Sequence, residues 1–474
     1  MATSRLPLVV VLGATGAGKS KLAIEIAKIF KGEIISADSM QVYKGLDIIT
    51  NKVSPDEQQE CPHHLISYLE ADHRHYNIVD FRDAALPIID DLLSKRILPI
   101  VVGGTNYYIE SVIWNFLIDK KLSPEDGIND PAKNLQDFTD DSNALLRCLN
   151  GMDSLDLYSH LQIIDPGTAS QMHPNNRRKI IRAIQVYYEC QQTMSSLLSE
   201  QHDGQENVKS GPLRYPHPCI LWVKCQQPDL NARLDGRVDE MMARGLVAEL
   251  ENFHKEVARL EALKRDNSSL DTGHTYTHGI LQMIGFKEFH AYLQLSVEDR
   301  ASDSGQKLLQ QGVTDLKLAT RRYARQQVRW ITNRFCNRPG SNVPPIYAVD
   351  STDLTQWDKT VEEAVEVVKA YIAGELPRKA PEMVVPKVET QLERNVCDLC
   401  GGRIFLHSHE WAGHLKSKKH KFNVKMLAAK RKQLIELLSA REEQLKKTAD
   451  ESLVTAHGRS EASFPEDTLF NVFL

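Results

Sequence analysis

The residues best suited to chemistry form a glycine-rich loop near the N-terminus, Gly13-Ala14-Thr15-Gly16-Ala17-Gly18-Lys19-Ser20. The loop follows an apolar run, Leu8 to Leu12, and precedes a helical pattern from Lys19 to Phe30. In this setting its spacing predicts a phosphate-binding loop (P-loop), because backbone N–H groups and the helix N-terminus converge on phosphate oxygens. Lys19 adds positive charge, and the Ser20 hydroxyl is a suitable Mg²⁺ ligand. We therefore expect a substrate that carries a di- or triphosphate.

The most common continuation of such a loop is a kinase or ATPase, which usually carries an acid at the end of a second buried strand. Here the matching strand, Ile97 to Val102, ends in Gly103-Gly104-Thr105. The acid is instead Asp38, after the expected strand Glu33 to Ala37. Asp38 is suited to orient Mg²⁺ or to act as a general base, and it is equally suited to cap a helix. The residues alone leave these roles open.

Short apolar strands that alternate with helices indicate an α/β fold with a parallel, P-loop NTPase-like sheet. Strand-like runs vanish after about residue 118, and a strand returns at Cys219 to Cys225. We therefore expect a helical insertion domain and a small C-terminal unit. The predicted divisions are a first part of the P-loop core (1–118), the insertion (119–211), a second part of the core (212–345), a helix and linker (346–392), a Cys/His unit with a basic helix (393–447) and a disordered tail (448–474).

The C-terminal unit carries Cys397-x2-Cys400-x13-His414-x5-His420, which falls within the spacing of a Cys2His2 zinc site. Two thiolates and two imidazoles close a tetrahedral site, so we expect structural Zn²⁺, with Trp411 and Leu415 placed to form a small core. Residues 393–447 contain thirteen Lys/Arg and six Asp/Glu, whereas the whole chain has a formal net charge of −5. The local positive charge of residues 393–447, and not the net charge of the whole chain, therefore indicates a nucleic-acid partner. Whether this Cys/His unit, a predicted zinc finger, contacts protein instead stays open.

Composition excludes several other classes of protein. The chain has eight cysteines with only one close pair, a pattern typical of a reduced, intracellular protein. It has no apolar run near the ~20 residues of a membrane span. Only Met1 to Pro7 precede the first strand, which leaves no room for a presequence. We expect a cytoplasmic monomer and leave mitochondrial and nuclear pools open.

Several collinear blocks of the chain together resemble the tRNA dimethylallyltransferases, also called tRNA isopentenyltransferases. The blocks span roughly residues 8 to 335, and their combination is far more specific than any one of them. The finger resembles the matrin-type finger of the eukaryotic branch. Besides the P-loop, the blocks are Asp38-Ser-Met-Gln-Val-Tyr43, Pro62-His-His64, Val101-Val-Gly-Gly-Thr-Asn-Tyr-Tyr108, His173-Pro-Asn-Asn-Arg-Arg178, Leu230-Asn-Ala-Arg-Leu-Asp-Gly-Arg-Val238, Gly279-Ile-Leu-Gln-Met-Ile-Gly-Phe-Lys-Glu288 and Thr320-Arg-Arg-Tyr-Ala-Arg-Gln-Gln327.

The resemblance implies transfer of a dimethylallyl group from dimethylallyl diphosphate to N6 of adenine-37 in tRNA, with release of diphosphate. It also implies that the P-loop and Mg²⁺ hold the diphosphate, that Asp38 is the catalytic base, and that Thr15 and Arg237 lie at the reacting atoms. The residues implied to contact the flipped base are Asp38, Ser39, Met40, Gln41 and Thr105.

Two basic helices are candidate tRNA-binding segments. Arg322, Arg325 and Arg329 fall at i, i+3 and i+7, one stripe along a helix, and the insertion carries Arg177, Arg178 and Arg182. A solvated helix face explains such stripes equally well, and it is the resemblance that favours phosphate contacts.

Three other functions compete with tRNA modification. They are transfer of the same group to free adenine nucleotides, a P-loop kinase or ATPase, and a nucleic-acid-binding finger protein with an inert P-loop. The missing second-strand acid argues against the kinase, and the insertion and finger argue against a free nucleotide as acceptor.

Overall fold

The structure is a computed structural model that describes residues 6–73, 76–115, 145–146, 148–200, 212–265, 279–338, 342–382 and 392–456. The chain forms two compact units. The first comprises Met1–Lys121 and Leu197–Lys387, and it contains the P-loop. The second comprises Leu122–Ser196 and Val388–Leu474, so it joins most of the insertion to the Cys/His unit.

A six-stranded, all-parallel sheet forms the centre of the first unit, in the order β3-β2-β4-β1-β5-β6. The predicted parallel, P-loop-type sheet is therefore confirmed. The P-loop strand β1 lies between β4 and β5, and every residue of β1 is buried. The strands are β1 (Val9–Gly13), β2 (Glu33–Ser36), β3 (His63–His64), β4 (Pro99–Val102), β5 (Cys219–Lys224) and β6 (Ile346–Asp350).

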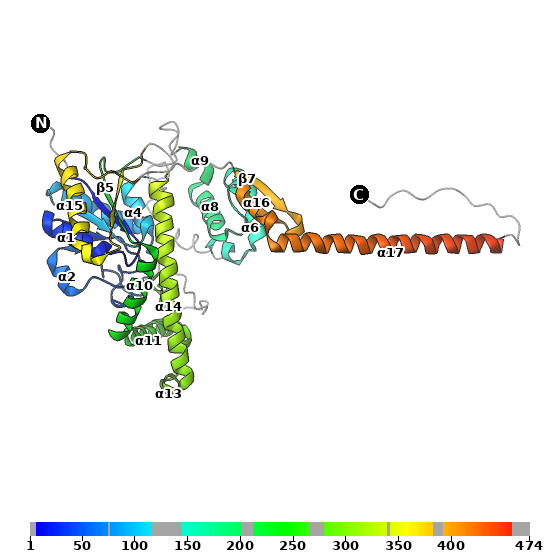
Figure 1. The fold of residues 1–474 in the computed structure, drawn as a ribbon, viewed down its shortest axis with the longest axis horizontal. Helices are drawn as coiled ribbons and strands as arrows, with labels where there is room; N and C mark the ends of the chain where they lie inside the picture. The colour runs from blue at the N-terminus through cyan, green and yellow to red at the C-terminus, as the bar shows by residue number, and fades with distance from the viewer. Residues whose placement is uncertain are drawn as a thin grey trace, which may run out of the picture. The chain divides into compact units, whose positions relative to one another are not determined.

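Side chains alternate between the two faces of the sheet, so each face has its own core. Val9 and Val11 pack with helices α1 (Lys19–Phe30) and α15 (Trp357–Ala373). Val10 and Leu12 pack on the opposite face, with α3 (Ile78–Ser94) and α4 (Asn106–Ile113). Helices therefore cover the sheet on both sides, with α1 and α15 on one side and α4 on the other (Figure 1). Helix α2 (Pro55–Glu60) and the 3₁₀ helix η3 (Leu354–Gln356) complete this part of the unit.

A third core lies among the helices that follow β5. Residues Gln227 to Arg265 form two helices, because Gly245 adopts a left-handed φ of 95° between them. The long helix α14 continues into a π-helical turn, η2. These elements are α10 (Gln227–Ala243), α11 (Leu246–Arg265), η1 (Gly279–Gln282), α12 (His290–Leu293), α13 (Val297–Ala301), α14 (Asp303–Trp330) and η2 (Ile331–Cys336).

Strand β6 lies where the sequence predicted only a helix and a linker over residues 346–392. The run Ile346–Asp350 has five residues and follows two prolines, so it carried little signal of its own. Strand β6 pairs with β5 from Ile220 to Lys224. Helix α15, which follows β6 in the chain, packs on one face of the sheet. The core therefore extends beyond residue 345.

The second unit contains insertion helices, a two-stranded antiparallel sheet and the final helix. The imidazole of His173, in the insertion, lies with Nε2 3.1 Å from the backbone oxygen of Ile404 in β8. Its elements are α6 (Ser154–Ile164), α7 (Pro166–Ser170), α8 (Arg177–Cys190), the start of α9 (Met194–Glu200), β7 (Leu392–Cys397), η4 (Asp398–Cys400), β8 (Arg403–His407), α16 (Ser408–Lys416) and α17 (Lys418–Ala456).

Helix α17 extends past Lys447, into the first part of the predicted disordered tail. The rest of that tail, from residue 457, lies outside the described residues, as do 119–144, 147 and 201–211 of the predicted insertion and 383–391 of the linker. Among the residues that are described, no helix has the length and apolar character required to span a bilayer.

A fully buried carboxylate fastens α4 to the end of α14. Glu110 accepts hydrogen bonds from Trp330 Nε1 at 2.5 Å and from Arg334 at 2.9 Å, and Arg338 approaches it at 3.4 Å. The Arg338 guanidinium also lies 3.9 Å from the centre of the Trp114 ring. Arg334 thus pairs with a buried acid.

Removal of this carboxylate should strongly destabilise the first unit. We expect Glu110→Ala to lower the free energy of unfolding by about 3–5 kcal/mol, because it leaves arginine charges without their buried counter-ion. Urea unfolding monitored by tryptophan fluorescence measures the effect. The control Glu366→Ala, at an exposed position of α15, should change stability by less than about 0.5 kcal/mol. Equal stability of the two variants would contradict this role of Glu110.

Candidate active site and zinc centre

The ends of three adjacent strands bring the candidate catalytic residues together. The neighbours β2, β4 and β1 run parallel, so the P-loop, Asp38 and the Gly103-Gly104-Thr105 turn lie at the same edge of the sheet. Beyond the strands, the N–H of Ala37 donates to Val102 O (2.8 Å), and the N–H of Thr105 donates to Ala37 O (3.0 Å). A Cβ at Gly103 would lie 2.0 Å from Ala37 O, so only glycine permits this approach.

The P-loop has the geometry of an anion site. Gly16 and Gly18 adopt left-handed φ angles of 84° and 95°, which turn the chain into α1. The first N–H groups of α1 have no acceptor within the helix, so they are available to an anion. The buried ammonium of Lys19 donates to Ala14 O at 2.9 Å, and burial lowers its pKa to about 8. Ser20 lies exposed at the start of the helix and lines the same cavity.

Arg237 and Thr15 are in direct contact across the site. The guanidinium, from α10, donates to Thr15 Oγ1 at 3.0 Å, and burial lowers its pKa. Helix α10 is held against α14 by the ion pair of Arg321 with Asp235 at 2.6 Å. Arg233, one turn earlier, donates to the backbone oxygens of Ser351 and Thr352, both at 2.6 Å, so it ties α10 to the end of β6.

Asp38 combines a turn-capping oxygen with an oxygen near the cavity. Its Oδ1 accepts from the N–H of Met40 at 2.9 Å, and its Oδ2 lies 2.9 Å from where a Cβ at Gly104 would be. The hydroxyl of Thr105 accepts from the Ser39 N–H at 2.9 Å and donates to the Ser39 hydroxyl at 3.1 Å. Asp38, Ser39 and Thr105 are thus brought together, and the capping role of Asp38 leaves one oxygen for chemistry.

Gln41 supports the loop that walls the site. Its Nε2 donates to the backbone oxygens of Thr50 and Asn51, at 3.1 and 3.2 Å, so both amide hydrogens have partners. Glu249 of α11 holds the same loop by accepting from the N–H groups of Ile48 and Ile49. A contact of Gln41 with an adenine stays a prediction, but its two amide hydrogens are already bonded to the backbone oxygens of Thr50 and Asn51.

Two adjoining cavities meet at these residues. The smaller, about 250 Å³, contains the P-loop, and the larger, about 520 Å³, extends over Met40 towards α14. The larger cavity is lined partly by apolar side chains, among them Met241, Met283 and Leu316. Both cavities are lined by Thr15, Asp38, Thr50, Asn51, Arg237 and Tyr323.

Tyr323 and Gln327 were not predicted as site residues. Both come from the Thr320–Gln327 block, so their motif was visible although their roles were not. The Tyr323 hydroxyl donates to Gly104 O at 3.1 Å, and burial raises the pKa of this phenol.

The basic residues differ in their surroundings. Arg322 and Arg325 are exposed on α14, and Arg178 and Arg182 are exposed on α8. Arg177 is half-buried and donates to the backbone oxygens of Leu149, Asn150 and Met152 at 2.5–3.0 Å. Arg177 therefore fastens the start of α8, whereas the exposed arginines present charge to solvent.

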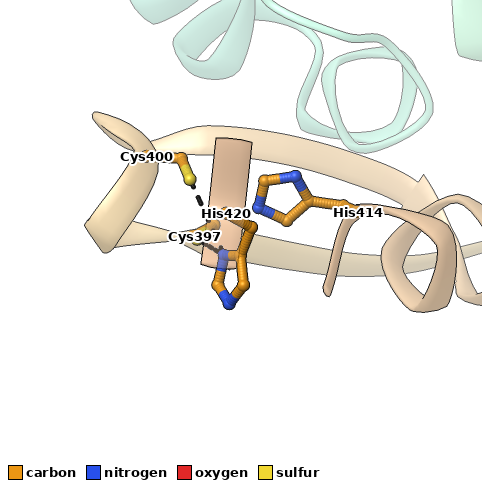
Figure 2. Close-up of side chains that lie close together, drawn as sticks. All are labelled: Cys397, Cys400, His414 and His420. Carbon is orange, nitrogen blue, oxygen red and sulfur yellow. Dashed lines mark hydrogen bonds between the residues drawn. The ribbon is translucent and has the colours of Figure 1, made fainter. Parts of the chain in front are cut away.

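The predicted zinc ligands converge in the second unit, and Figure 2 shows their four side chains facing one another. The ligand atoms of Cys397, Cys400, His414 and His420 all lie within 4.8 Å of one another. A tetrahedral Zn²⁺ site separates ligand atoms by about 3.3–3.8 Å, so the set requires only a small contraction. The Nε2 atom of His414 is buried and has no hydrogen-bond partner among the described residues, as expected of a metal ligand.

The small core beside the zinc ligands differs from the prediction in one residue. Phe405 of β8 packs against Trp411 and His414, with ring centres 5.6 and 4.4 Å apart. Leu415, expected in this core, is 40% exposed. The strand that supplies Phe405 faces α16, and the sequence pattern did not reveal this pairing.

The fold and site define an α/β P-loop protein in which a carboxylate and an arginine line the P-loop cavity, with no acid at the end of β4. A family model described as IPP transferase matches residues 41–334, and the chain belongs to this family. It is 44% identical to the tRNA dimethylallyltransferase of Mus musculus, over 89% of this chain and 86% of that protein. Its identity to the Homo sapiens tRNA dimethylallyltransferase is 43%, over 88% and 85%.

A solved structure of a eukaryotic dimethylallyltransferase acting on tRNA is similar to this chain, with a TM-score of 0.73 at 28% identity. The match covers 90% of this chain and 98% of that chain. The family resemblance and the enzyme class predicted from the sequence motifs are confirmed.

Zinc content tests the ligand set. We expect one Zn²⁺ per purified chain by inductively coupled plasma mass spectrometry, and none after Cys397→Ser and Cys400→Ser are combined. The control Cys148→Ser, at an exposed cysteine outside the cluster, should retain the metal. Zinc that persists in the double variant, or a wild-type protein without zinc, would contradict the assignment.

Ionisation of Lys19 tests the P-loop. Only the protonated ammonium attracts an anion, and the pKa of Lys19 in the free protein is about 8. We therefore expect the Kd of inorganic diphosphate, measured by calorimetry, to rise above pH 8 by up to about tenfold per pH unit. Lys19→Arg stays charged, so this pH-dependent weakening should disappear in that variant. The same rise in both proteins would contradict the assigned role.

Proposed function

We propose that this protein transfers a dimethylallyl group from dimethylallyl diphosphate to N6 of adenine-37 in tRNA and releases diphosphate. One observation carries the proposal beyond family membership. Asp38 lines both the P-loop cavity and the larger adjoining cavity, and Thr15 and Arg237 lie at the same junction. A base for the acceptor and cations for the leaving group therefore meet at one place.

The P-loop side accounts for the donor. As the bond between carbon C1 and the diphosphate oxygen breaks, the electron pair and negative charge move to the diphosphate. Lys19, the N–H groups at the start of α1 and Arg237 supply positive charge at that place. No water has to be directed at a γ-phosphate, which is consistent with the Gly-Gly-Thr end of β4.

The Asp38 side accounts for the acceptor. The adenine amino group is a weak nucleophile, and Asp38 accepts its proton as the new bond between N6 and C1 forms. The adenine must first leave its stack, which costs a few kcal/mol and is least costly in a single-stranded loop. Ser39, Met40 and Thr105 lie beside Asp38, which supports a contact of these residues with the extruded base. The larger cavity, of about 520 Å³, gives it room.

Mg²⁺ belongs with the donor in this proposal. The exposed hydroxyl of Ser20 and the carboxylate of Asp38 line the P-loop cavity, and both offer the oxygen ligands that Mg²⁺ prefers. Bound there with diphosphate, the ion would neutralise charge on the leaving group.

Exposed arginines on both units are suited to the tRNA backbone. Arg322 and Arg325 present one charged stripe on α14, and Arg178 and Arg182 present another on α8. Phosphate contacts of this kind supply affinity that falls with salt. We assign Arg177 a supporting role, in which its bonds to backbone oxygens hold the start of α8 and so position the exposed Arg178 and Arg182.

Replacement of the proposed base tests the function. The wild-type protein should transfer radiolabel from dimethylallyl diphosphate to a tRNA with adenosines at positions 36 and 37. Asp38→Asn should lower the rate about 10²–10⁴-fold, because the isosteric amide accepts no proton. The control Asp72→Asn, at an exposed acid that lines neither cavity, should retain the rate.

The same assay separates the competing functions. A wild-type protein that hydrolysed ATP and left tRNA unlabelled would replace the proposal with an ATPase. Label on free adenine nucleotides, with none on tRNA, would instead indicate a free-nucleotide transferase.

A further inference from the structure

Gln327 of α14 joins the two halves of the site through one side chain. Its Oε1 accepts the backbone N–H of Thr15, in the P-loop, at 2.8 Å. Its Nε2 donates to the backbone oxygen of Gly104, in the turn beside Asp38, at 2.8 Å. The residue is only 3% exposed, so water competes little for either bond.

The bridge requires both a donor and an acceptor on one side chain. A carboxamide has both, whereas a carboxylate would face the Gly104 oxygen with a second acceptor. The two partners also fix the orientation of the amide, because exchange of its oxygen and nitrogen would place like groups together. Gln327 thus holds the Thr15 N–H away from the phosphate, and the start of α1 must supply the N–H groups that bind it.

The Gly104 end of the bridge is tightly packed. A Cβ at Gly104 would lie 2.9 Å from Asp38 Oδ2 and 3.0 Å from Gln327 Nε2, so Asp38 and Gln327 both lie close to this turn. The Tyr323 hydroxyl is a second donor to the same Gly104 oxygen, at 3.1 Å. Helix α14 therefore holds the turn through two side chains one helical turn apart.

We propose that Gln327 is a positioning residue that sets the separation between the diphosphate loop and the Asp38 side of the site. The inference rests on the proposed transfer reaction. In that reaction the donor carbon and the adenine N6 are held from opposite sides of the junction, so the loop and the turn must keep a fixed spacing for the two atoms to align. Gln327 lines the P-loop cavity, but its amide oxygen and nitrogen bond to Thr15 and Gly104, so we assign its effect to these two contacts.

The first test is Gln327→Met, which keeps the length of the side chain and removes both hydrogen bonds. We expect the single-turnover rate to fall about 10–100-fold, because small errors in alignment are costly. The KM values for dimethylallyl diphosphate and tRNA should stay within about threefold, since each substrate keeps its own contacts. The control Gln310→Ala, at an exposed glutamine of the same helix, should behave as wild type.

The second test is a double-mutant cycle with Tyr323→Phe. Each single variant leaves the Gly104 oxygen one donor, and the double variant removes both. The loss of rate in the double variant should therefore exceed the product of the single losses by at least about threefold. Independent contributions would multiply, and that outcome would contradict a shared role at Gly104.

The inference fails separately from the proposed function. An inactive wild-type protein would overturn the transfer reaction itself. An active wild type with an unchanged rate in Gln327→Met would overturn only the positioning role. A rate that fell merely in proportion to the fraction of protein able to bind diphosphate, titrated in the same samples, would also overturn it, because Gln327 would then serve folding alone.

Discussion

The close approach of two backbone segments at the end of the sheet is the constraint on which the site depends. Ala37 follows β2 and Gly103 follows β4, and a Cβ at Gly103 would lie 2.0 Å from the Ala37 oxygen. Hydrogen bonds from Ala37 to Val102 and from Thr105 to Ala37 lock this contact. Asp38 is consequently held beside the Gly104 turn, and β4 lies between the strand that precedes Asp38 and the strand that precedes the P-loop. An acid at this strand end, as in an ATPase, would occupy the space that the glycines leave open.

The altered strand end changes the expected fate of the phosphate. The loop itself has the N–H groups, the lysine and the helix start of an ordinary phosphate site. The residues around the loop differ from those of an ordinary phosphate site. Arg237 of α10 donates a hydrogen bond to Thr15, and Asp38 lines the same cavity as the loop. This arrangement suits a diphosphate that departs with an electron pair while a nucleophile loses a proton on the other side. Phosphoryl transfer would need neither the second cavity nor a carboxylate at that place.

Local patterns in the sequence predicted much of this structure. The P-loop helix has the predicted bounds, Lys19–Phe30, and the spacing of Cys397, Cys400, His414 and His420 alone predicted that they converge on one candidate metal site. Asp38 and the Gly103 turn could be placed at one edge of the sheet because parallel strands align their ends.

Strand β6 was missed, because its five residues are identifiable as a strand only by their pairing with β5. The roles of Thr15 and Arg237 came from the family resemblance, because a lone arginine among acids has no distinctive local pattern. Gln327 meets Thr15 across 312 residues, Glu110 meets Arg334 across 224, and Arg177 is committed to carbonyls rather than exposed. Such pairings depend on tertiary packing, which no local spacing specifies.

The most direct measurement of the central claim is mass spectrometry of tRNA nucleosides from cells that lack this protein, with the gene restored in wild-type or Asp38→Asn form. It reports the transferred group, the modified base and the tRNA together. The account predicts that N6-dimethylallyl-adenosine at position 37 disappears from at least one tRNA, returns with the wild-type protein and stays absent with Asp38→Asn. Unchanged nucleosides in the absence of the protein, or full restoration by Asp38→Asn, would contradict it.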